Sequence, residues 1–214
     1  RKFHVRCEAG ENLEITSKSY LSLSDLADLG TVMPNVYHTK EEMIDCVNAF
    51  YNGMVARSEE MKQHPKYKTG ENYAYLGLPP CFLIFDEYVA FFEMLATKES
   101  MSLLSQLKKI VMLGRQAGYF LIVACQRPDA KYFSDGIRDN FNFRVGLGRI
   151  SELGYGMLFG SDVKKQFFQK RIKGRGYCDV GTSVISEFYT PLVPKEHDFL
   201  QTIGSLAQAR QDGT

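Results

Sequence analysis

Two short apolar runs constrain the fold of this chain more than any other feature of its sequence. Residues 81–87 read CFLIFDE and residues 119–125 read YFLIVAC. Between them the pattern of apolar residues indicates helices at about Tyr88–Ala96 and Ser100–Ala117, the second stopped by Gly118. Continuous apolar strands that alternate with helices are typical of a parallel sheet with helices over both faces. The sequence therefore predicts an α/β fold with a mainly parallel sheet flanked by helices.

The remaining segments fit this fold class. The polar segment from Gln63 to Pro80 is predicted to be a long loop. Thr39-Lys-Glu-Glu42 has the form of a capping box, and the helix that it opens carries an apolar stripe of Met43, Val47, Phe50, Met54 and Met61. Further expected elements are strands at LEIT (13–16) and Phe141–Leu147, a hairpin of GYCDV and SVISEFY around Gly181-Thr182, and a helix from Lys195 to about Ala207.

The composition limits the classes of function that the chain can have. Its 214 residues carry a net charge of +1, so any affinity for nucleic acid must come from local patches. The five cysteines form no Cys-x-x-Cys pair, which favours free thiols in a reducing compartment over disulfides or a zinc site. No apolar run approaches the ~18 residues of a membrane helix. Because the first residue is Arg, we expect the chain to be a fragment of a longer protein.

Two carboxylates, Asp86 and Glu87, close the first apolar run, at the strand end where open α/β sheets bind ligands. A strand that ends in Asp-Glu has the form of a Walker B element, in which the Asp holds Mg²⁺ and the Glu orients or deprotonates the attacking water. The structural alternative is a strand that runs into the acidic start of a helix. A metal-dependent phosphotransferase or nuclease is a third interpretation, but it needs further carboxylates, and Glu93 and Asp129 are the next candidates.

Two polar residues favour the Walker B interpretation. Gln126 follows the second apolar strand and is a neutral donor suited to a γ-phosphate or an attacking water. Arg115 lies in GRQAG, at the end of the preceding helix. An arginine there either stabilises the helix C-terminus or serves as an arginine finger for the nucleotide of a neighbouring subunit.

Several stretches together resemble a known family. IFDEYVAFFEML and VMLGRQAGYFLIVACQRPDA are similar to the FtsK/SpoIIIE family of DNA-translocating ATPases, which has a Walker B strand, a helix, a GRAAG-like turn and a strand ending in ATQRP. LADLGTVMPNVY, VARSEEM, IRDNFNFRVGLGR and GRGYCDVGTSVISEFYTPLVP resemble the FtsK-like coupling proteins of Gram-positive conjugative elements. The resemblance covers about residues 13–200, with 1–12 uncertain and 201–214 as a C-terminal tail. It implies that residues 1–214 are a partial RecA-like P-loop ATPase domain.

The resemblance also implies roles for single residues. Asp86 would hold Mg²⁺ through water in the ATP site, Glu87 would be the catalytic base, Gln126 the γ-phosphate sensor, and Arg115 the finger in trans. ATP and Mg²⁺ are the implied cofactors. Motors of this family form hexameric rings around double- or single-stranded DNA at the cytoplasmic face of the membrane, and the conjugative ones work with relaxase and channel proteins. The chain itself is expected to be soluble, without a membrane segment.

One element of the family is absent from the sequence. The phosphate-binding loop G-x-x-x-x-G-K-[ST] does not occur, and the nearest stretch, Asn12–Ser19, has Lys18 and Ser19 but neither glycine. We therefore expect the Walker A element upstream of Arg1, and the chain to be the C-terminal part of a DNA translocase for conjugative transfer, inactive alone. The alternative is a non-catalytic assembly or partner-binding module that has lost its P-loop. Apolar surface is expected where the missing strand and helix belong.

Contacts with DNA are expected from basic residues. Residues 164–175, KKQFFQKRIKGR, hold six cations and no acid, which is typical either of a solvated surface or of a patch that tracks phosphates. Phe167 and Phe168 are expected to face the core, with stacking on bases as the alternative. Tyr155–Met157 is expected to lie in a flexible loop. The candidates for DNA binding are Arg127, Lys131, Arg138, Arg149, Lys164 and Lys165.

Overall fold

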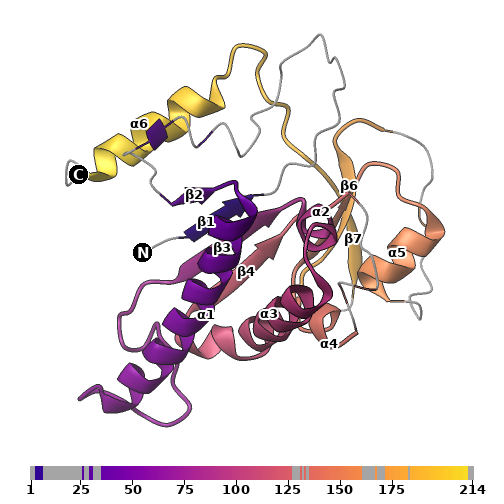
Figure 1. Cartoon of the computed structure of the whole chain (residues 1–214). Helices are drawn as coiled ribbons and strands as arrows, with labels where there is room; N and C mark the ends of the chain where they lie inside the picture. Colours follow the sequence, from indigo (N-terminus) through magenta and orange to yellow (C-terminus); the bar gives the residue numbers. More distant parts are fainter. Residues whose placement is uncertain are drawn as a thin grey trace. The chain divides into compact units, whose positions relative to one another are not determined.

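A computed structural model of the chain describes residues 3–6, 26, 29–30, 35–126, 131, 133, 135–160, 167, 172–182 and 184–211. The chain divides into two compact units (Figure 1). The first unit comprises Arg1–Cys125 and Lys195–Thr214, and the second comprises Gln126–Pro194. The first contains a parallel sheet and the second an antiparallel sheet. The predicted α/β class is confirmed, although the strands divide between two sheets.

A four-stranded parallel sheet lies at the centre of the first unit, in the order β2-β1-β3-β4. Strand β3 is the predicted strand CFLIFD, and β4 is the predicted strand that follows α3. In their register Cys81 lies opposite Tyr119 and Phe85 lies opposite Val123. The elements of this unit are β1 (Phe3–Arg6), β2 (Val36–Tyr37), α1 (Lys40–Gln63), β3 (Cys81–Asp86), α2 (Tyr88–Glu93), α3 (Thr97–Ala117), β4 (Tyr119–Val123) and α6 (Phe199–Gln211).

Helix α1 begins and packs as the sequence predicts. The Thr39 hydroxyl accepts a hydrogen bond from the Glu42 amide at 3.3 Å, and the Glu42 carboxylate accepts one from the Thr39 amide at 3.2 Å. These two bonds complete the predicted capping box. Every member of the predicted apolar stripe is buried, with at most 4% of its surface exposed. The predicted loop follows the helix and ends where β3 begins, at Cys81.

Helix α3 packs very closely on β4 because of a glycine. A Cβ atom at Gly114 would lie 2.3 Å from the Tyr119 carbonyl oxygen, so a larger residue would push the helix away from the strand. Gly118 ends the helix in the left-handed conformation, with φ 77°, as predicted. The boundaries differ slightly from the prediction, since α3 begins at Thr97 and α2 ends at Glu93.

The core of the first unit lies between the parallel sheet and helices α1 and α3, which cover one face of the sheet (Figure 1). Cys81, Leu83 and Phe85 of β3 are 0–2% exposed, and the Phe50 ring of α1 lies 4.8 Å from the ring of Tyr119. The alternate residues of β3 are only half-buried. The predicted burial of the strands on both faces is therefore confirmed for one face alone.

A three-stranded antiparallel sheet, in the order β5-β6-β7, forms the second unit. The predicted hairpin is confirmed as β6 and β7, and Gly181 in its turn has φ 83°. The strand predicted at 141–147 is shorter than expected and joins this sheet, not the parallel one. The elements of this unit are α4 (Asp135–Arg138), β5 (Arg144–Leu147), α5 (Glu152–Phe159), β6 (Arg175–Asp179) and β7 (Ile185–Tyr189).

The expectation of a flexible loop at Tyr155–Met157 is wrong, because these residues belong to helix α5. Ser151 caps the helix by accepting a hydrogen bond from the Gly154 amide at 3.1 Å. Tyr155 is 1% exposed and packs with Phe159, Tyr177 and Ile185. The ring of Phe167 stacks on that of Tyr155 at 4.0 Å, so Phe167 faces the core as predicted.

Some predictions fall on residues that the structure does not describe. These are the strand at 13–16, the stretch Asn12–Ser19 and the side chain of Phe168. Within the described residues, no helix is both long enough and apolar enough to span a membrane.

Candidate functional site

The predicted carboxylate pair lies at the carboxyl end of the parallel sheet. Asp86 is the last residue of β3, which has β1 on one side and β4 on the other, and Glu87 follows directly. The Asp86 carboxylate accepts a hydrogen bond from the Glu87 amide at 3.1 Å. Both residues are half-buried, so they remain in reach of water and ligand. A pair in this position is placed where open α/β sheets bind their ligands.

The backbone of Glu87 is strained. Its φ of 48° and ψ of 44° are left-handed, and it is the one non-glycine residue with positive φ in the described part of the chain. This conformation costs roughly 1–2 kcal/mol for a residue with a Cβ atom. Three backbone hydrogen bonds hold the turn: Tyr88 amide to Ala124 carbonyl at 3.0 Å, Ala124 amide to Phe85 carbonyl at 2.8 Å, and Phe91 amide to Glu87 carbonyl at 3.3 Å.

Two side chains close to Glu87 were not singled out from the sequence. Tyr88 is 1% exposed, and its ring lies 5.4 Å from that of Phe85 and 4.7 Å from that of Phe92. Burial, and secondarily the nearby Glu87 carboxylate, raise the pKa of the Cys125 thiol to about 11. Burial and the neighbouring Cys125 raise the pKa of Tyr88. The sequence signal for Cys125 was its place at the end of the apolar run 119–125, next to Gln126.

Gln126 is exposed, lies three residues beyond Val123, the last residue of β4, and is the first residue of the second unit. Gln126 thus follows β4, the strand that pairs with β3.

Arg115 lies at the opposite end of the sheet from the carboxylate pair. It is exposed in the last turn of α3, and the Cys81 amide, at the start of β3, donates to the Gly118 carbonyl at 2.7 Å. From Cys81 the strand runs to Asp86, roughly 16 Å away at ~3.3 Å per residue. Arg115 therefore does not reach the carboxylates of its own chain, and a role in nucleotide hydrolysis requires a second copy.

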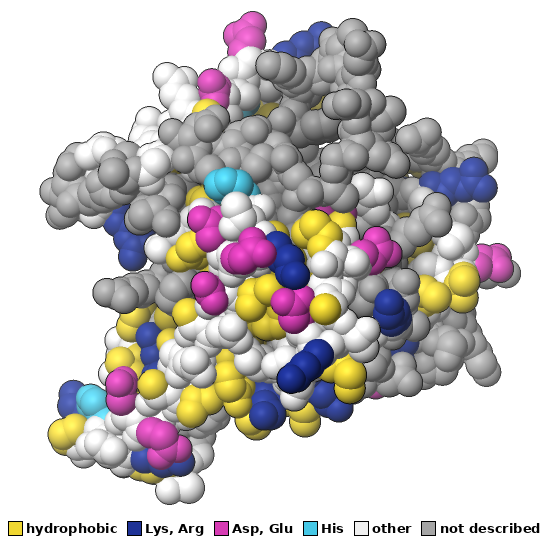
Figure 2. Space-filling model, in the orientation of Figure 1, with side chains coloured by type: hydrophobic (Ala, Val, Ile, Leu, Met, Phe, Trp, Pro, Cys, Tyr) yellow, Lys and Arg dark blue, Asp and Glu magenta, His cyan; other side chains and the backbone are white. Residues whose placement is uncertain are grey.

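The outward face of α3, which leads to Arg115, is partly apolar. Met101, Met112 and Leu113 are 52–67% exposed. Lys98, Lys108 and Lys109 are exposed on the same helix, and the Lys109 ammonium lies 5.5 Å from the centre of the Tyr51 ring of α1. Figure 2 shows basic and apolar side chains side by side over α1 and α3.

The predicted DNA-binding residues have different environments. Lys131 and Arg149 are exposed. Arg138 pairs with Asp139 at 3.3 Å, and its side chain is 24% exposed. Arg127, Lys164 and Lys165 lie outside the described residues.

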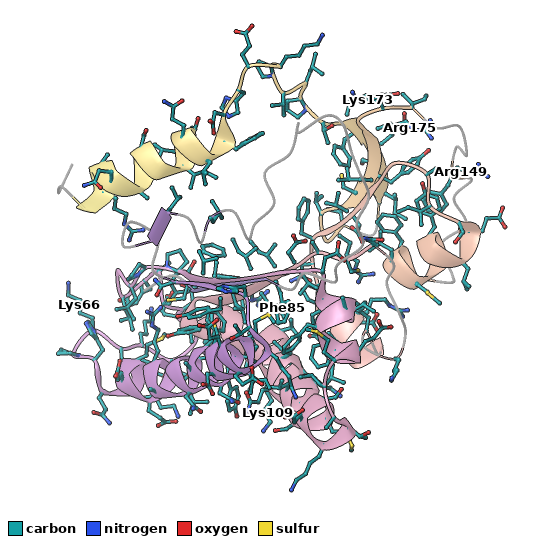
Figure 3. The ribbon with its side chains drawn as sticks, turned by 45° about the horizontal axis from the view of Figure 1, so that its top comes forward. Lys66, Phe85, Lys109, Arg149, Lys173 and Arg175 are labelled. Atoms are coloured by element: carbon teal, nitrogen blue, oxygen red, sulfur yellow. The ribbon has the colours of Figure 1, made fainter. Side chains whose placement is uncertain are left out.

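The basic run at 164–175 is not uniformly a surface patch. Lys173 is exposed, but Arg175 is 2% exposed and lies 4.0 Å from the Glu187 carboxylate and 5.6 Å from the Tyr177 ring centre (Figure 3). The expectation that Arg175 belongs to a surface patch is therefore wrong. In β6 its side chain points to the same sheet face as Tyr177, and that face carries the core of the second unit.

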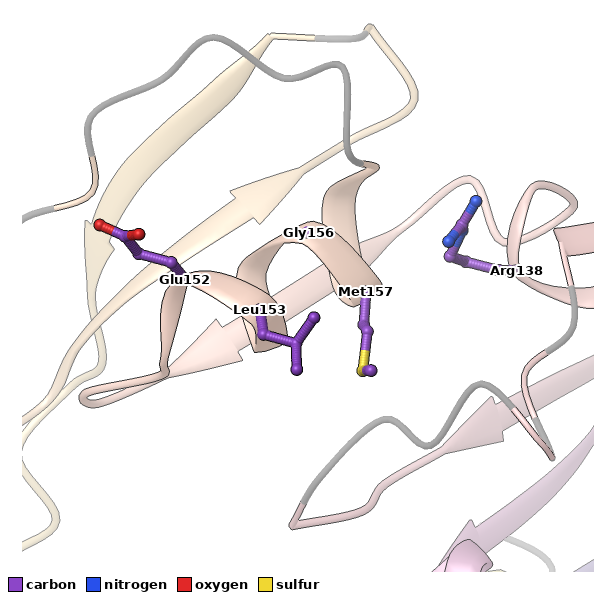
Figure 4. Close-up of a pocket in the computed structure, with 5 residues that line it drawn as sticks. All are labelled: Arg138, Glu152, Leu153, Gly156 and Met157. Carbon is purple, nitrogen blue, oxygen red and sulfur yellow. The ribbon is translucent and has the colours of Figure 1, made fainter.

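A pocket of about 370 Å³ lies on the second unit, and none of the predicted catalytic residues lines it. It is lined by Arg138, Glu152, Leu153, Gly156 and Met157. Leu153 and Met157 extend from one side of α5, and Glu152 points away from them (Figure 4). Leu153 is 70% exposed, so the pocket has an apolar wall open to solvent.

The described residues contain no cluster of three or more His, Cys, Asp or Glu that could hold a metal ion. Glu93, one of the two further carboxylates considered for a two-metal site, is exposed at the end of α2, and Asp129 lies outside the described residues.

Comparisons with known proteins relate the chain to one curated protein and to several solved structures. No family model matches the chain. The FtsK domain-containing protein YdcQ of Bacillus subtilis (strain 168) is 56% identical over 181 residues, which are 84% of this chain and 38% of that protein. The chain thus spans well under half the length of this relative.

Solved structures with low sequence identity share the fold. The pCW3 conjugation coupling protein TcpA, solved as a monomer with ATPγS, matches 96% of this chain and 56% of its own, with a TM-score of 0.61 at 15% identity. EssC (ATPases 2 and 3) from Geobacillus thermodenitrificans matches 99% of this chain and 37% of its own, with a TM-score of 0.66 at 15% identity. The cytoplasmic domain of the Type VII secretion ATPase EccC from Thermomonospora curvata matches 96% of this chain and 24% of its own, with a TM-score of 0.59 at 16% identity.

The fold is thus that of FtsK-like ATPase domains, with a carboxylate pair at the carboxyl end of its parallel sheet. The high identity to YdcQ then gives the family: the chain belongs to the FtsK-domain proteins, as its motifs predicted.

Proposed function

We propose that this chain is the Walker B part of an ATP-driven DNA translocase that serves conjugative DNA transfer. The observation that carries the proposal is the pair Asp86–Glu87 at the end of an interior parallel strand in an FtsK-domain chain. The likeness to a conjugation coupling protein solved with ATPγS supports both the nucleotide and the setting.

Each polar residue of the site has a distinct part in this proposal. Asp86 would hold Mg²⁺ through water, and the ion would neutralise charge on the phosphates. Glu87 accepts a proton from the attacking water or orients it, and Gln126 contacts the γ-phosphate. The left-handed backbone of Glu87 sets the direction of its side chain at the end of β3, and backbone hydrogen bonds hold this turn in place.

Arg115 acts on the site of a neighbouring copy in this proposal. Its distance from Asp86 within one chain and its exposure at the end of the partly apolar face of α3 both favour a homo-oligomer. The family resemblance suggests a hexameric ring at the cytoplasmic face of the membrane, with DNA in its centre and relaxase and channel proteins as partners. Lys131 and Arg149 are the exposed candidates for contacts with DNA phosphates, with Arg127, Arg138, Lys164 and Lys165 as further candidates.

The P-loop is expected upstream of Arg1. In the described residues no strand pairs with the outer edge of β4, and the sheet face that bears Ile122, itself 48% exposed, is only partly covered. A further parallel strand needs a crossover helix, which would cover such a face. A strand, P-loop and helix therefore fit this part of the sheet, and the 214 residues alone are expected to be inactive.

Steady-state ATP hydrolysis by the full-length product of the coding sequence, with and without double-stranded DNA, tests the proposal. We expect turnover that DNA stimulates and that Glu87→Gln lowers by roughly 10²- to 10⁴-fold, because the amide cannot accept the proton. Glu93→Gln is the matched control, since it removes an exposed carboxylate at the other end of α2. Equal loss in the two variants would contradict the role of Glu87.

Mixing inactive variants tests the role of Arg115. Arg115→Ala and Glu87→Gln subunits are each expected to be inactive when assembled alone. Mixed assemblies contain sites with an intact Glu87 from one subunit and an intact Arg115 from the next, so they should regain part of the activity. Mixtures as inactive as the single variants would contradict action in trans.

A second candidate function is a non-catalytic assembly or partner-binding module. The observation that favours it is the absence of G-x-x-x-x-G-K-[ST] from the 214 residues. Reading the coding sequence upstream of Arg1 separates the two candidates. A P-loop there favours the motor, whereas its absence together with tight partner binding and no turnover favours the module.

A further inference from the structure

The left-handed backbone of Glu87 needs a physical cause, because a non-glycine residue leaves this conformation unless its surroundings hold it there. Glu87 precedes α2 as its N-cap residue, but its side chain makes no capping hydrogen bond. The turn is therefore not held by a side-chain cap. The backbone hydrogen bonds on either side of Glu87 and the packing of Tyr88 beneath it are the contacts that can hold it.

We infer that Tyr88 is a positioning residue for the site: its buried ring and its amide bond to Ala124 hold Glu87 in the left-handed conformation and so aim the Glu87 carboxylate. This inference rests on the proposed role of Glu87 as the general base. Tyr88 does not need to touch the nucleotide, since it acts through the backbone of the preceding residue.

The contacts of Tyr88 anchor it on three sides. Its amide donates to the Ala124 carbonyl of the neighbouring strand at 3.0 Å. Its ring packs edge-on against Phe85, the buried residue of β3 that precedes Asp86. On the helix side the ring lies 4.7 Å from that of Phe92. With 1% of its surface exposed, Tyr88 cannot shift without opening this cluster, and Glu87 cannot relax unless Tyr88 shifts.

Relaxation of Glu87 would change the direction of its side chain. A right-handed Glu87 would extend α2 by one residue towards the strand, and the carboxylate would then project from the helix instead of the edge of the sheet. A misplacement of about 1 Å can cost about 10²-fold in rate. The packing of Tyr88 therefore sets turnover, while nucleotide binding, which depends on other groups, stays nearly unchanged.

A stability measurement on the 214-residue chain tests the positioning without any ATP hydrolysis. Glu87→Gly relieves the left-handed strain, whereas Glu87→Ala removes the same carboxylate and keeps the strain. In the wild-type background we expect the folding equilibrium constant of Glu87→Gly to be roughly fivefold larger than that of Glu87→Ala. In a Tyr88→Leu background the advantage should vanish, because Glu87 has already relaxed. Urea unfolding followed by circular dichroism measures both ratios, and an undiminished advantage in Tyr88→Leu would overturn the inference.

Controls separate positioning from a general loss of packing. Tyr88→Phe keeps the ring and should keep the advantage of glycine. Met61→Ala loosens the core of the same unit, since Met61 is 4% exposed, but it does so at the other end of the sheet, one turn after Arg57, which donates to the Pro79 carbonyl just before β3. It should therefore keep the advantage as well, and its loss there would overturn the inference. If Tyr88→Leu does not fold, Tyr88→Met replaces it in the same comparison.

Kinetics of the full-length product then test the consequence for the site. Tyr88→Leu should lower kcat by about tenfold or more while KM for ATP changes by less than about twofold, and Met61→Ala and Tyr88→Phe should keep the wild-type kcat. The double variant Tyr88→Leu/Glu87→Gln should be no slower than Glu87→Gln alone, because Tyr88 acts through Glu87.

The outcomes distinguish this inference from the proposed function. The wild type could show no ATP hydrolysis while Glu87→Gly is still more stable than Glu87→Ala only when Tyr88 is present. That result would refute the ATPase proposal and keep the positioning of Glu87 by Tyr88. Normal kcat in Tyr88→Leu, beside an inactive Glu87→Gln, would keep the ATPase proposal and overturn the role of Tyr88.

Discussion

The two faces of the parallel sheet have similar residues but different surroundings. Cys81, Leu83 and Phe85 point to α1 and α3 and are 0–2% exposed. On the other face Phe82 stacks on Phe120 at 5.5 Å and Ile84 lies opposite Ile122, which is 48% exposed. Both faces are apolar, but within the described residues only the first is closely packed.

This difference shows that an apolar face and a packed face are separate properties. Parallel sheets occur almost only where both faces are covered, so the apolar residues of the second face are suited to a cover that the described residues supply only in part. In the proposed domain, a further strand and its crossover helix supply the rest of this cover. Predictions about the two faces therefore test the proposed domain as well as its stability.

The largest difference is expected between two phenylalanines of β3. Phe85→Ala should lower the free energy of unfolding by about 3–5 kcal/mol, because Phe85 is fully buried and contacts the rings of Tyr88 and Phe91. Phe82→Ala should cost about 1–2 kcal/mol, since Phe82 is half-buried and loses mainly its stacking on Phe120. Urea unfolding of both variants measures the two losses in free energy of unfolding. Equal costs would show that the second face is as tightly packed as the first.

An effect of intermediate size is expected at the contact between α3 and β4. Gly114→Ala places a Cβ atom 2.3 Å from the Tyr119 carbonyl oxygen, so the helix must move away from the packed face, at a cost of about 1–3 kcal/mol. Gly156→Ala in α5 is the control, because a Cβ atom there meets nothing within 4 Å. It should raise the free energy of unfolding by about 0.5–1 kcal/mol. A thermal unfolding midpoint for Gly114→Ala at or above that of the wild type would contradict the close contact.

The sequence was sufficient for the elements whose signals are local. The capping box at Thr39, the apolar stripe of α1 and the glycine stop at Gly118 depend on neighbouring residues, and each lies where it was predicted. The strand predicted at 141–147 shows the limit. Its apolar pattern suits either sheet, and only its pairing partner, β6, decides that it joins the antiparallel one.

The site was predictable in its residues but not in its geometry. Asp86 and Glu87 could be found because they end an apolar run, and that run forms β3. The left-handed turn at Glu87 could not be found, since Glu carries no preference for positive φ and the turn depends on bonds to Ala124, far away in the sequence. The distance between Arg115 and Asp86 likewise follows from the parallel direction of β3 and β4, which no local motif encodes.

The smallest effect is expected on the open face, and it depends on the length of the protein. Ile122→Thr should cost less than about 1 kcal/mol in the 214-residue chain, because Ile122 is 48% exposed. In the full-length product a covering helix would bury this side chain, so the same substitution should cost about 1.5–3 kcal/mol. Urea unfolding of both proteins gives the two costs. A larger cost in the longer protein supports a strand and helix beside β4, whereas equal costs would mean that this face stays open and that the P-loop does not pack there.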